Sequence, residues 1–447
     1  MGKPTGFIDY ARCRAADRPA DERINDFAWI HRSLDSAARK EQAARCMDCG
    51  VPFCQTEMKQ QGQQAVGCPL RNLIPQWNEQ LYNDNLPLAL ERLLKTNCFP
   101  EFTGYVCPAP CERACSCRKS TGSVSINDNE RYIIDTAFEQ GLMQPRVPSC
   151  RSGKRVAVVG SGPAGLSVAH LLNQRGHQVV VFEREASAGG LLVYGIPSMK
   201  LPYEVVERRI ELMKAEGVEF RCGVNVGEDL RFEELTGAYD AVVVAVGAQK
   251  PREVPFEGSA QGVCYALEYM GAVTRWQRGE DALADAFNAA GKSVAIVGAG
   301  NSANDCIATA LRQGCTDVVQ IIRRPASDYG AATDYAHEEA YAKFGRDIRR
   351  FQSNVVRVVP DENGQLASLE LSTADSAQSV PAQMLVIASG FTGAEDTVTR
   401  AIPRDADNLF YAGDMELGAS LVVRAMAHAR QTARVVDVFL NGYSPLR

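Results

Sequence analysis

The residues best suited to chemistry are the cysteines in the first third of the chain. The 447-residue sequence contains 15 cysteines, and most of them lie between positions 46 and 117. In a chain that begins without an apolar signal segment, such a density indicates metal or redox chemistry rather than disulfide bonds. Seven of these cysteines fall into two spaced groups: Cys46, Cys49, Cys54 and Cys68, followed by Cys107, Cys111 and Cys115.

These spacings are typical of iron–sulfur ligation. Structural zinc sites use paired knuckles, in which two residues separate two cysteines, and only Cys46 and Cys49 form such a pair here. Two [4Fe–4S] clusters need four ligands each, so seven cysteines leave one ligand to be supplied. An oxygen or nitrogen donor, Cys98 or Cys117 could complete the set. We predict two [4Fe–4S] clusters, with zinc and free thiols as the alternatives.

A glycine-rich loop predicts a dinucleotide site in the middle of the chain. It follows the apolar segment 155–159, precedes a helical pattern, and reads Gly160-Ser161-Gly162-Pro163-Ala164-Gly165. The glycines permit a tight turn, a close approach to a pyrophosphate, and close packing of the helix on the strand. Glu183 ends the next apolar segment, where a carboxylate can bind ribose hydroxyls.

Later segments indicate that this dinucleotide is a flavin. Gly413 and Asp414 follow an apolar strand, and a helix is expected over 420–440. An aspartate there can hold a ribityl hydroxyl, and the helix N-terminus can stabilise the negative charge of a reduced flavin. The other residues expected to contact this cofactor are Arg184, Gly190, Leu191, Gly195, Gly247, Ser420 and Leu421.

The same unit occurs a second time at 294–324. Its loop carries alanine at the third glycine position, a permitted variant, and reads Gly298-Ala299-Gly300-Asn301-Ser302-Ala303. Ile322 takes the place of the ribose-binding acid, and Arg323 and Arg324 follow it. Because two guanidinium groups can bind a 2′-phosphate, we predict that this site prefers NADPH to NADH. Alternatively, the two arginines simply occupy the solvent-exposed end of a strand and bind no phosphate.

Two β-turn-α-β units predict an α/β fold with two Rossmann-like, parallel-sheet domains after a mostly helical, cysteine-rich region. We expect residues 1–150 to form the helical iron–sulfur domain. Residues 151–254 and 389–447 should form a discontinuous flavin domain, and residues 255–388 a nicotinamide-nucleotide domain inserted into it. This nesting is inferred in part from the resemblance described below.

Charge and hydropathy exclude several classes of protein. The sequence has 48 basic and 54 acidic residues, a net charge of −6, without the basic excess of a nucleic-acid-binding protein. No apolar run approaches the roughly 20 residues that a membrane span needs. We expect a cytoplasmic protein that binds neither nucleic acid nor membrane.

Several longer segments carry a family resemblance. They include RCMDCGVPFC (45–54), NCFPEFTGYVCPAPCERAC (97–115), VGSGPAGL (159–166), GGLLVYGIPSMKL (189–201) and AGDMELGASLVVRAMAHAR (412–430). Over almost its whole length the chain resembles the small (β) subunits of glutamate synthase and their wider NADPH–flavin–iron–sulfur relatives.

The resemblance implies FAD as the flavin and a division of the cluster ligands. One cluster would take Cys46, Cys49, Cys54 and Cys115. The other would take Cys68, Cys107, Cys111 and a Gln or Glu from a following helix, here Glu130. The resemblance also implies a large (α) subunit that makes glutamate from glutamine and 2-oxoglutarate. The chain itself would be an NADPH-oxidising electron-transfer subunit without catalytic side chains.

Other functions stay open at this point. A related reductase could donate electrons to ferredoxin or another acceptor, and a non-catalytic flavin and cluster scaffold is also conceivable. A disulfide reductase of the thioredoxin-reductase type is disfavoured. The Cys46–Cys49 pair lies outside both dinucleotide domains, although the attacking thiols of such an enzyme must lie beside the flavin.

Overall fold

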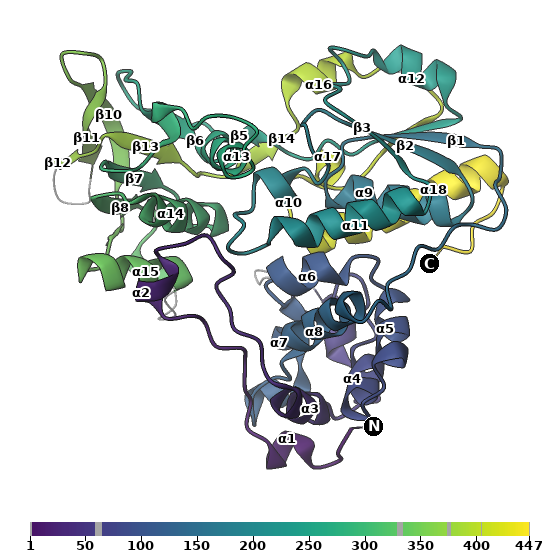
Figure 1. Ribbon diagram of the computed structural model, residues 1–447. Helices are drawn as coiled ribbons and strands as arrows, with labels where there is room; N and C mark the ends of the chain where they lie inside the picture. The colour runs from purple at the N-terminus through teal and green to yellow at the C-terminus, as the bar shows by residue number, and fades with distance from the viewer. Residues whose placement is uncertain (1, 59–64, 329–333, 373–376, 404, 447) are drawn as a thin grey trace.

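The computed structural model describes residues 2–58, 65–328, 334–372, 377–403 and 405–446. Figure 1 shows a helical N-terminal region below two domains, each built on its own sheet. Of the helices within those ranges, none is long and apolar enough to cross a membrane.

The helical region holds the clustered cysteines. Four of its helices carry proline in their first turn, a position where the missing N–H costs nothing. Trp77, Phe99 and Phe102 are fully buried in its core. Its elements are α1 (Gly6–Asp9), α2 (Ala20–Arg23), α3 (Ser36–Ala44), η1 (Phe53–Gln55), α4 (Ile74–Tyr82), α5 (Leu86–Leu94), α6 (Pro100–Val106), α7 (Pro110–Ala114), η2 (Ser116–Lys119) and α8 (Ile126–Glu139).

The first sheet has five parallel strands in the order β15-β4-β1-β2-β3. The strands are β1 (Arg155–Val159), β2 (Gln178–Glu183), β3 (Glu219–Cys222), β4 (Ala241–Val244) and β15 (Leu409–Tyr411). The central strands contain buried apolar runs, at 156–159, 179–182 and 241–244, because helices cover both faces. In Figure 1, α9 (Pro163–Gln174), α11 (Tyr203–Ala215) and α18 (Val422–Asn441) lie on one face, with α12 (Phe232–Ala238) and α16 (Asp396–Ala401) on the other.

The second sheet also has five parallel strands, in the order β6-β13-β7-β8-β9. They are β6 (Val263–Tyr265), β7 (Ser293–Val297), β8 (Asp317–Ile321), β9 (Arg349–Arg350) and β13 (Met384–Ile387), with helices α13 (Ala266–Gln277), α14 (Asn301–Gln313) and α15 (Tyr335–Phe344). All these strands lie between β4 and β15 in the sequence, so this domain interrupts the first one. The two Rossmann-like sheets therefore agree with the predicted fold class.

An antiparallel sheet extends the second domain. It consists of β10 (Asn354–Pro360), β11 (Leu366–Ser372) and β12 (Ala377–Pro381), and its apolar face packs on Val319 and Leu385 of the parallel sheet. A short antiparallel pair, β5 (Lys250–Pro251) and β14 (Phe391–Gly393), joins the two domains. The chain thus enters and leaves the inserted domain at one place.

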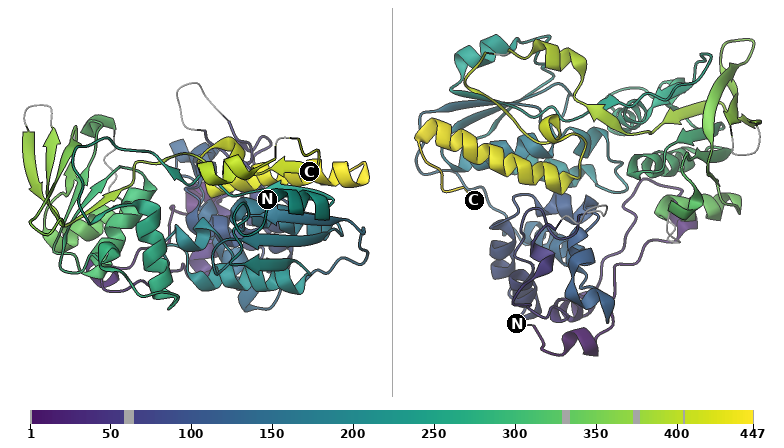
Figure 2. Two further views of the ribbon diagram at one scale, coloured as in Figure 1. Left: turned by 90° about the horizontal axis from the view of Figure 1, so that it is seen from above. Right: turned by 180° about the vertical axis from the view of Figure 1, so that it is seen from behind.

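Residues 10–35, here called the N-terminal strap, leave the helical region and run to the inserted domain before they return at α3 (Figures 1 and 2). The backbone N–H of Ile30 donates to the carbonyl oxygen of Met199 across 3.1 Å, which ties the strap to the first sheet domain. The guanidinium of Arg131 on α8 lies over the ring of Trp29, with its Cζ atom 4.1 Å from the centroid of that ring. The strap therefore contacts all three parts of the molecule.

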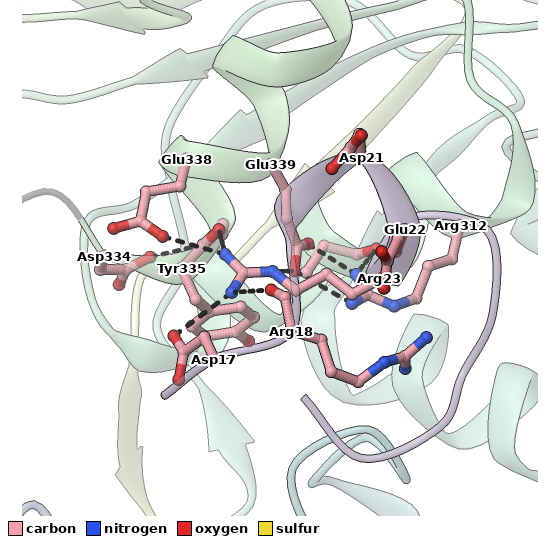
Figure 3. A network of polar contacts seen from close by, with 12 residues as sticks. Asp17, Arg18, Asp21, Glu22, Arg23, Arg312, Asp334, Tyr335, Glu338 and Glu339 are labelled. Atoms are coloured by element: carbon pink, nitrogen blue, oxygen red, sulfur yellow. Dashed lines mark hydrogen bonds and ion pairs between the residues drawn. The ribbon is translucent and has the colours of Figure 1, made fainter. Parts of the chain in front are cut away.

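Arg23 anchors the strap on the inserted domain. Its side chain is 1% exposed, and its Nε lies 2.6 Å from Oε1 of Glu339, a buried carboxylate on α15. Arg312 binds the same carboxylate through two hydrogen bonds of 2.6 and 3.0 Å. Asp17 and Glu338 bind the other nitrogens of Arg23 at 3.2 and 3.0 Å (Figure 3). A buried charge needs such partners because its desolvation is costly.

Candidate functional site

Four of the predicted ligand cysteines line one cavity of the helical region. Cys46 and Cys49 follow α3, Cys54 lies in η1, and Cys115 directly follows α7. Burial raises the pKa of Cys46 to about 12, so this thiol remains protonated unless a metal binds it. Thiols among apolar side chains suit a soft metal centre. The lining includes Cys46, Cys49, Cys54, Cys115, Cys117, Phe53, Ile74 and Ile126.

Cys115 differs from its neighbours because a second thiol donates a hydrogen bond to it. This bond from Cys117 lowers the pKa of Cys115 to about 6, although burial opposes the shift. Cys117 is itself buried, and its Sγ lies 3.9 Å from the carbonyl oxygen of Arg45. Cys117 therefore lies with the first set of cysteines.

Cys68, Cys107 and Cys111 form a second set beside Glu130. Burial, followed by the charge of Glu130, raises the pKa of Cys107 above its usual value. Burial raises the pKa of Cys68 to about 11, and the charge of Glu130 contributes to this shift. Burial and the other two cysteines raise the pKa of Cys111 well above its usual value. The four side chains are thus close enough to affect one another's ionisation.

Glu130 projects from α8 and is held by two hydrogen bonds. Its Oε1 accepts from Oγ1 of Thr103 at 2.5 Å and from Nδ2 of Asn97 at 2.9 Å. Burial raises the pKa of this carboxyl to about 7. Cys98, by contrast, points elsewhere, with its Sγ 3.6 Å from Oγ of Ser167 on α9. Of the donors named from the sequence for the eighth position, Glu130 is the one that lies with the second set.

Among the residues that the structure describes, no three His, Cys, Asp or Glu side chains converge closely enough to hold a single metal ion. Zinc requires four donors about 2.0–2.3 Å from one centre. In a [4Fe–4S] cluster each cysteine binds a different iron atom, so the donors stand farther apart.

A large cavity lies above the first glycine loop, and most residues predicted to bind a flavin line it. Val106, which directly precedes the ligand candidate Cys107, lines the same cavity, so the second cysteine set adjoins it. The predicted residues in its lining are Gly160, Ser161, Gly162, Pro163, Ala164, Glu183, Arg184, Gly190, Leu191, Gly195, Gly247, Asp414, Ser420 and Leu421.

Two predicted glycines act through packing instead. A Cβ atom on Gly165 would lie 1.9 Å from the carbonyl oxygen of Gly160, and one on Gly413 would lie 2.4 Å from Cβ of Ala164. Gly162 is different, because a Cβ there would meet no atom within 4 Å. The open space at Gly162, at the start of α9, is where a pyrophosphate can approach the backbone N–H groups.

Glu183 holds the glycine loop in place. Its Oε2 accepts hydrogen bonds from the backbone N–H of Ser161 at 3.0 Å and from the hydroxyl of Ser161 at 2.5 Å. That hydroxyl oxygen in turn accepts from the N–H of Gly189 at 2.8 Å. The sequence indicated a ribose contact for this carboxylate, and the structure adds a supporting role for it.

Asp414 is the first residue of the short helix α17 (Asp414–Leu417), and it contacts Ser420 just before α18. The backbone N–H and the hydroxyl of Ser420 donate to the carboxylate of Asp414, at 3.0 and 2.5 Å. The N–H of Gly413 donates to Nδ1 of His428 across 3.0 Å. The sequence did not single out His428. Its place on the helix expected after Gly413 was the one available indication of this contact.

The second glycine loop lies between β7 and α14. A Cβ on Gly298 would lie 2.2 Å from the carbonyl oxygen of Ala388, whereas one on Gly300 would meet nothing within 4 Å. Ala303 belongs to the first turn of α14 and is fully buried. Asn301 and Ser302 reach the flavin cavity, and Ser302 also lines a second cavity between the two sheet domains. Ala299 lies in the loop itself.

Arg323 and Arg324 follow β8 and are exposed. The N–H of Gly298 donates to the carbonyl oxygen of Ile321 across 3.1 Å, so the two arginines lie near the second glycine loop. Neither of the two cavities includes them.

An ion pair that the sequence did not reveal joins the two sheet domains at the flavin cavity. Nζ of Lys200 lies 2.7 Å from Oδ1 of Asp305 on α14, and the hydroxyl of Tyr335 donates to the same oxygen at 2.6 Å. Lys200 and Asp305 both line the cavity. Their contact depends on the domain arrangement, which no local pattern specifies.

Two family models match the chain. Residues 154–429 match the model described as pyridine nucleotide-disulphide oxidoreductase. Residues 23–142 match the model described as dihydropyrimidine dehydrogenase domain II, 4Fe-4S cluster.

Curated relatives match over the full length. The glutamate synthase [NADPH] small chain of Bacillus subtilis is 42% identical over 493 aligned positions, covering 100% of both chains. That of Mycobacterium tuberculosis H37Rv is 38% identical and covers 100% of this chain and 98% of the relative. Among solved structures, Mycobacterium tuberculosis FprA in complex with NADPH has a TM-score of 0.51 at 18% identity, over 65% of this chain and 85% of that one. This last likeness shows the fold alone.

Proposed function

This chain belongs to the glutamate synthase small-chain family, and we propose that it is the NADPH-oxidising, electron-transferring subunit of such an enzyme. The observation that supports the proposal is the position of two groups of candidate ligands, one beside the flavin cavity and the other around a separate, partly exposed cavity of the helical region. Bound FAD can accept two electrons from NADPH, and iron–sulfur clusters can carry them singly.

The first sheet domain offers the residues to hold FAD. The open backbone at Gly162 and the N-terminus of α9 can bind the pyrophosphate. Glu183 stabilises the loop and lines the cavity at the expected ribose position. Asp414 and the N-terminus of α18 lie in the same cavity, where they can hold the ribityl chain and stabilise negative charge.

The helical region offers eight ligands for two [4Fe–4S] clusters. We assign Cys46, Cys49, Cys54 and Cys115 to one cluster, and Cys68, Cys107, Cys111 and Glu130 to the other. Two observations support this assignment: the first four cysteines line one cavity, and the members of the second set affect one another's pKa values. Because Val106 lines the flavin cavity and adjoins Cys107, the second set is placed to receive electrons first.

The second sheet domain has the residues to bind NADPH. The open backbone at Gly300 leaves room for its pyrophosphate, and Arg323 and Arg324 lie near the loop, where a 2′-phosphate would carry extra negative charge. The cavity between the domains, lined by Tyr194, Ser302 and Ala388, can admit the nicotinamide toward the flavin cavity.

A large subunit is the proposed electron acceptor, as the name small chain implies for the relatives. The glutamate synthase [NADH] of Schizosaccharomyces pombe is 36% identical to this chain, and the match covers 99% of this chain but only 23% of that protein. The remainder of such an enzyme, where glutamate is made from glutamine and 2-oxoglutarate, would here be a separate chain.

Anaerobic addition of NADPH to the purified holoprotein tests this proposal. The flavin absorbance should bleach, and an artificial dye should be reduced without any formation of glutamate. Glutamate should form only after the large subunit is added. Flavin that stays oxidised, or glutamate made by this chain alone, would contradict the proposal.

A further inference from the structure

We propose that Arg430, on α18 of the first sheet domain, is a positioning residue for the second set of ligands. Its positive charge stabilises the reduced state of the cluster that this set would bind, and so raises the reduction potential of that cluster. The inference rests on the proposed function, because it requires a [4Fe–4S] cluster at Cys68, Cys107, Cys111 and Glu130.

Arg430 reaches from the first sheet domain into the helical region. Its Nη1 donates to the carbonyl oxygen of Thr96 at 2.8 Å, and its Nη2 donates to the carbonyl oxygen of Leu70 at 3.0 Å. Leu70 is buried and lies two residues after Cys68. The N–H of Arg71 donates to the carbonyl oxygen of Cys68 across 3.1 Å, which closes a turn there. The guanidinium of Arg430 thus holds the turn that follows a predicted ligand.

Neither contact neutralises the charge of Arg430. Both acceptors are backbone carbonyl oxygens, which carry no net charge, whereas a guanidinium keeps its proton in a protein. Arg23 differs in this respect, because its Nε lies 2.6 Å from the carboxylate of Glu339. The charge of Arg430 therefore acts on the other groups around it.

The thiols near Arg430 are affected by this charge. Burial raises the pKa of Cys68 to about 11, and the charge of Arg430 opposes the rise. Burial also raises the pKa of Cys98, again against the charge of Arg430. Charges interact more strongly in a buried environment than in water. A charge that favours negative sulfur at Cys68 also favours an added electron on a cluster bound there, since both place negative charge at the same position.

The direction of the effect follows from the charge of the cluster. A reduced [4Fe–4S] cluster holds one electron more than the oxidised cluster, and the net charge of a cluster is one of the factors that set its potential. Arg430 thus offsets the negative charge that Glu130 would bring as a ligand. A higher potential at the second set favours the arrival of electrons from the flavin. The same helix borders that cofactor's site, because Val422 and Ala425 line the flavin cavity.

Anaerobic redox titration of the holoprotein, followed by electron paramagnetic resonance, tests the inference. At a fixed potential, Arg430→Gln should decrease the ratio of reduced to oxidised second cluster at least threefold. This equals a fall of about 28 mV in midpoint potential, because a tenfold change corresponds to about 59 mV for one electron. Arg430→Lys, which keeps the charge, should shift the potential less than half as much. Arg434→Gln, an exposed position on the same helix, should leave it unchanged.

A second pair of variants changes the charge around Arg430 without removing this side chain. Cys98 is close enough for its charge to act on Arg430, so Cys98→Asp places a carboxylate beside the guanidinium. Cys98→Asn is the uncharged variant of the same shape. The second cluster, identified by the signal that Glu130→Gln alters, should have a lower potential in Cys98→Asp, by the same threefold criterion. This pair decides the question if Arg430→Gln binds less iron than the parent protein.

The outcomes separate the inference from the proposed function. A purely structural role would lower the iron content or thermal stability of both Arg430 variants without moving the potential of the cluster that remains. Equal potentials in Arg430→Gln and the parent protein, or in the two Cys98 variants, would overturn the inference while the proposed function stands. Equal shifts in Arg430→Gln and Arg430→Lys would overturn it too. A parent protein with about four iron atoms or none per chain, and no cluster at the second set, would overturn the proposed function and this inference with it.

Discussion

The backbone N–H of Cys68 donates a hydrogen bond to the carbonyl oxygen of Cys54 across 2.9 Å. These residues belong to different proposed ligand sets, so the bond would connect the two proposed clusters through only two residues. The neighbouring Gly67 donates from its N–H to the carbonyl oxygen of Pro110, also at 2.9 Å. The junction thus fixes one set relative to the other, as electron transfer between them requires.

Gly67 is essential to this junction. It adopts a φ of 87°, and a Cβ there would lie 1.8 Å from the carbonyl oxygen of Thr56. We expect Gly67→Ala to destabilise the protein by about 1–3 kcal/mol through backbone strain and to lower its iron content. Gly50→Ala is the matched control, because a Cβ at Gly50 meets nothing within 4 Å. Thermal unfolding and iron analysis report both effects, and equal behaviour of the two variants would refute this role.

Glu130 is the proposed eighth ligand. We expect Glu130→Ala to lose about four of eight iron atoms, whereas Glu130→Gln, which keeps a side-chain oxygen, should retain most of them. Cys98→Ser and Cys117→Ser are controls that should keep the full iron content. Iron analysis with electron paramagnetic resonance of the reduced protein distinguishes these cases. Loss of a cluster from Cys98→Ser would instead assign the ligand role to that thiol.

Arg323 and Arg324 are the proposed determinants of nucleotide choice. Replacing both by alanine should raise the KM for NADPH at least tenfold and change the KM for NADH about twofold or less, because only NADPH carries the 2′-phosphate. Arg346→Ala is a suitable control, since Arg346 pairs with Asp317 at the opposite end of β8. Steady-state dye reduction gives both constants. Equal increases for the two nucleotides would rule out the phosphate contact.

Arg23 should hold the N-terminal strap on the inserted domain. Arg23→Ala leaves the buried carboxylate of Glu339 with one partner fewer and is expected to cost about 3 kcal/mol. Arg18→Ala removes a more exposed pair with Asp26, which should cost less than about 1 kcal/mol. Limited proteolysis should cut the strap first in Arg23→Ala. Equal stability of both variants would show that the buried network (Figure 3) contributes little.

The two sheet domains were predictable because their signals are local. The first glycine loop, the apolar strand before it and Glu183 after it occupy one short stretch of sequence, and the second unit repeats the pattern. The helix expected over 420–440 forms as α18 (Val422–Asn441). The cysteine sets were predictable in composition, but their division into two groups came from family resemblance rather than from spacing.

The features that sequence reasoning missed depend on contacts between distant segments. Arg23 lies in a short, polar stretch that gives no sign of burial, yet it meets Glu339 more than three hundred positions later. Lys200 and Asp305 meet only because the two sheet domains face each other. The antiparallel strands β10 to β12 alternate irregularly between buried and exposed residues, so period-two patterning did not reveal them.

The central claim, that this chain conducts electrons from one flavin through two clusters, is tested most directly by its cofactor content. Anaerobically purified protein should contain about one FAD, about eight iron atoms and about eight acid-labile sulfides per chain. About four iron atoms would leave one ligand set without a cluster. Zinc in place of iron and sulfide, or the absence of flavin, would contradict the account altogether.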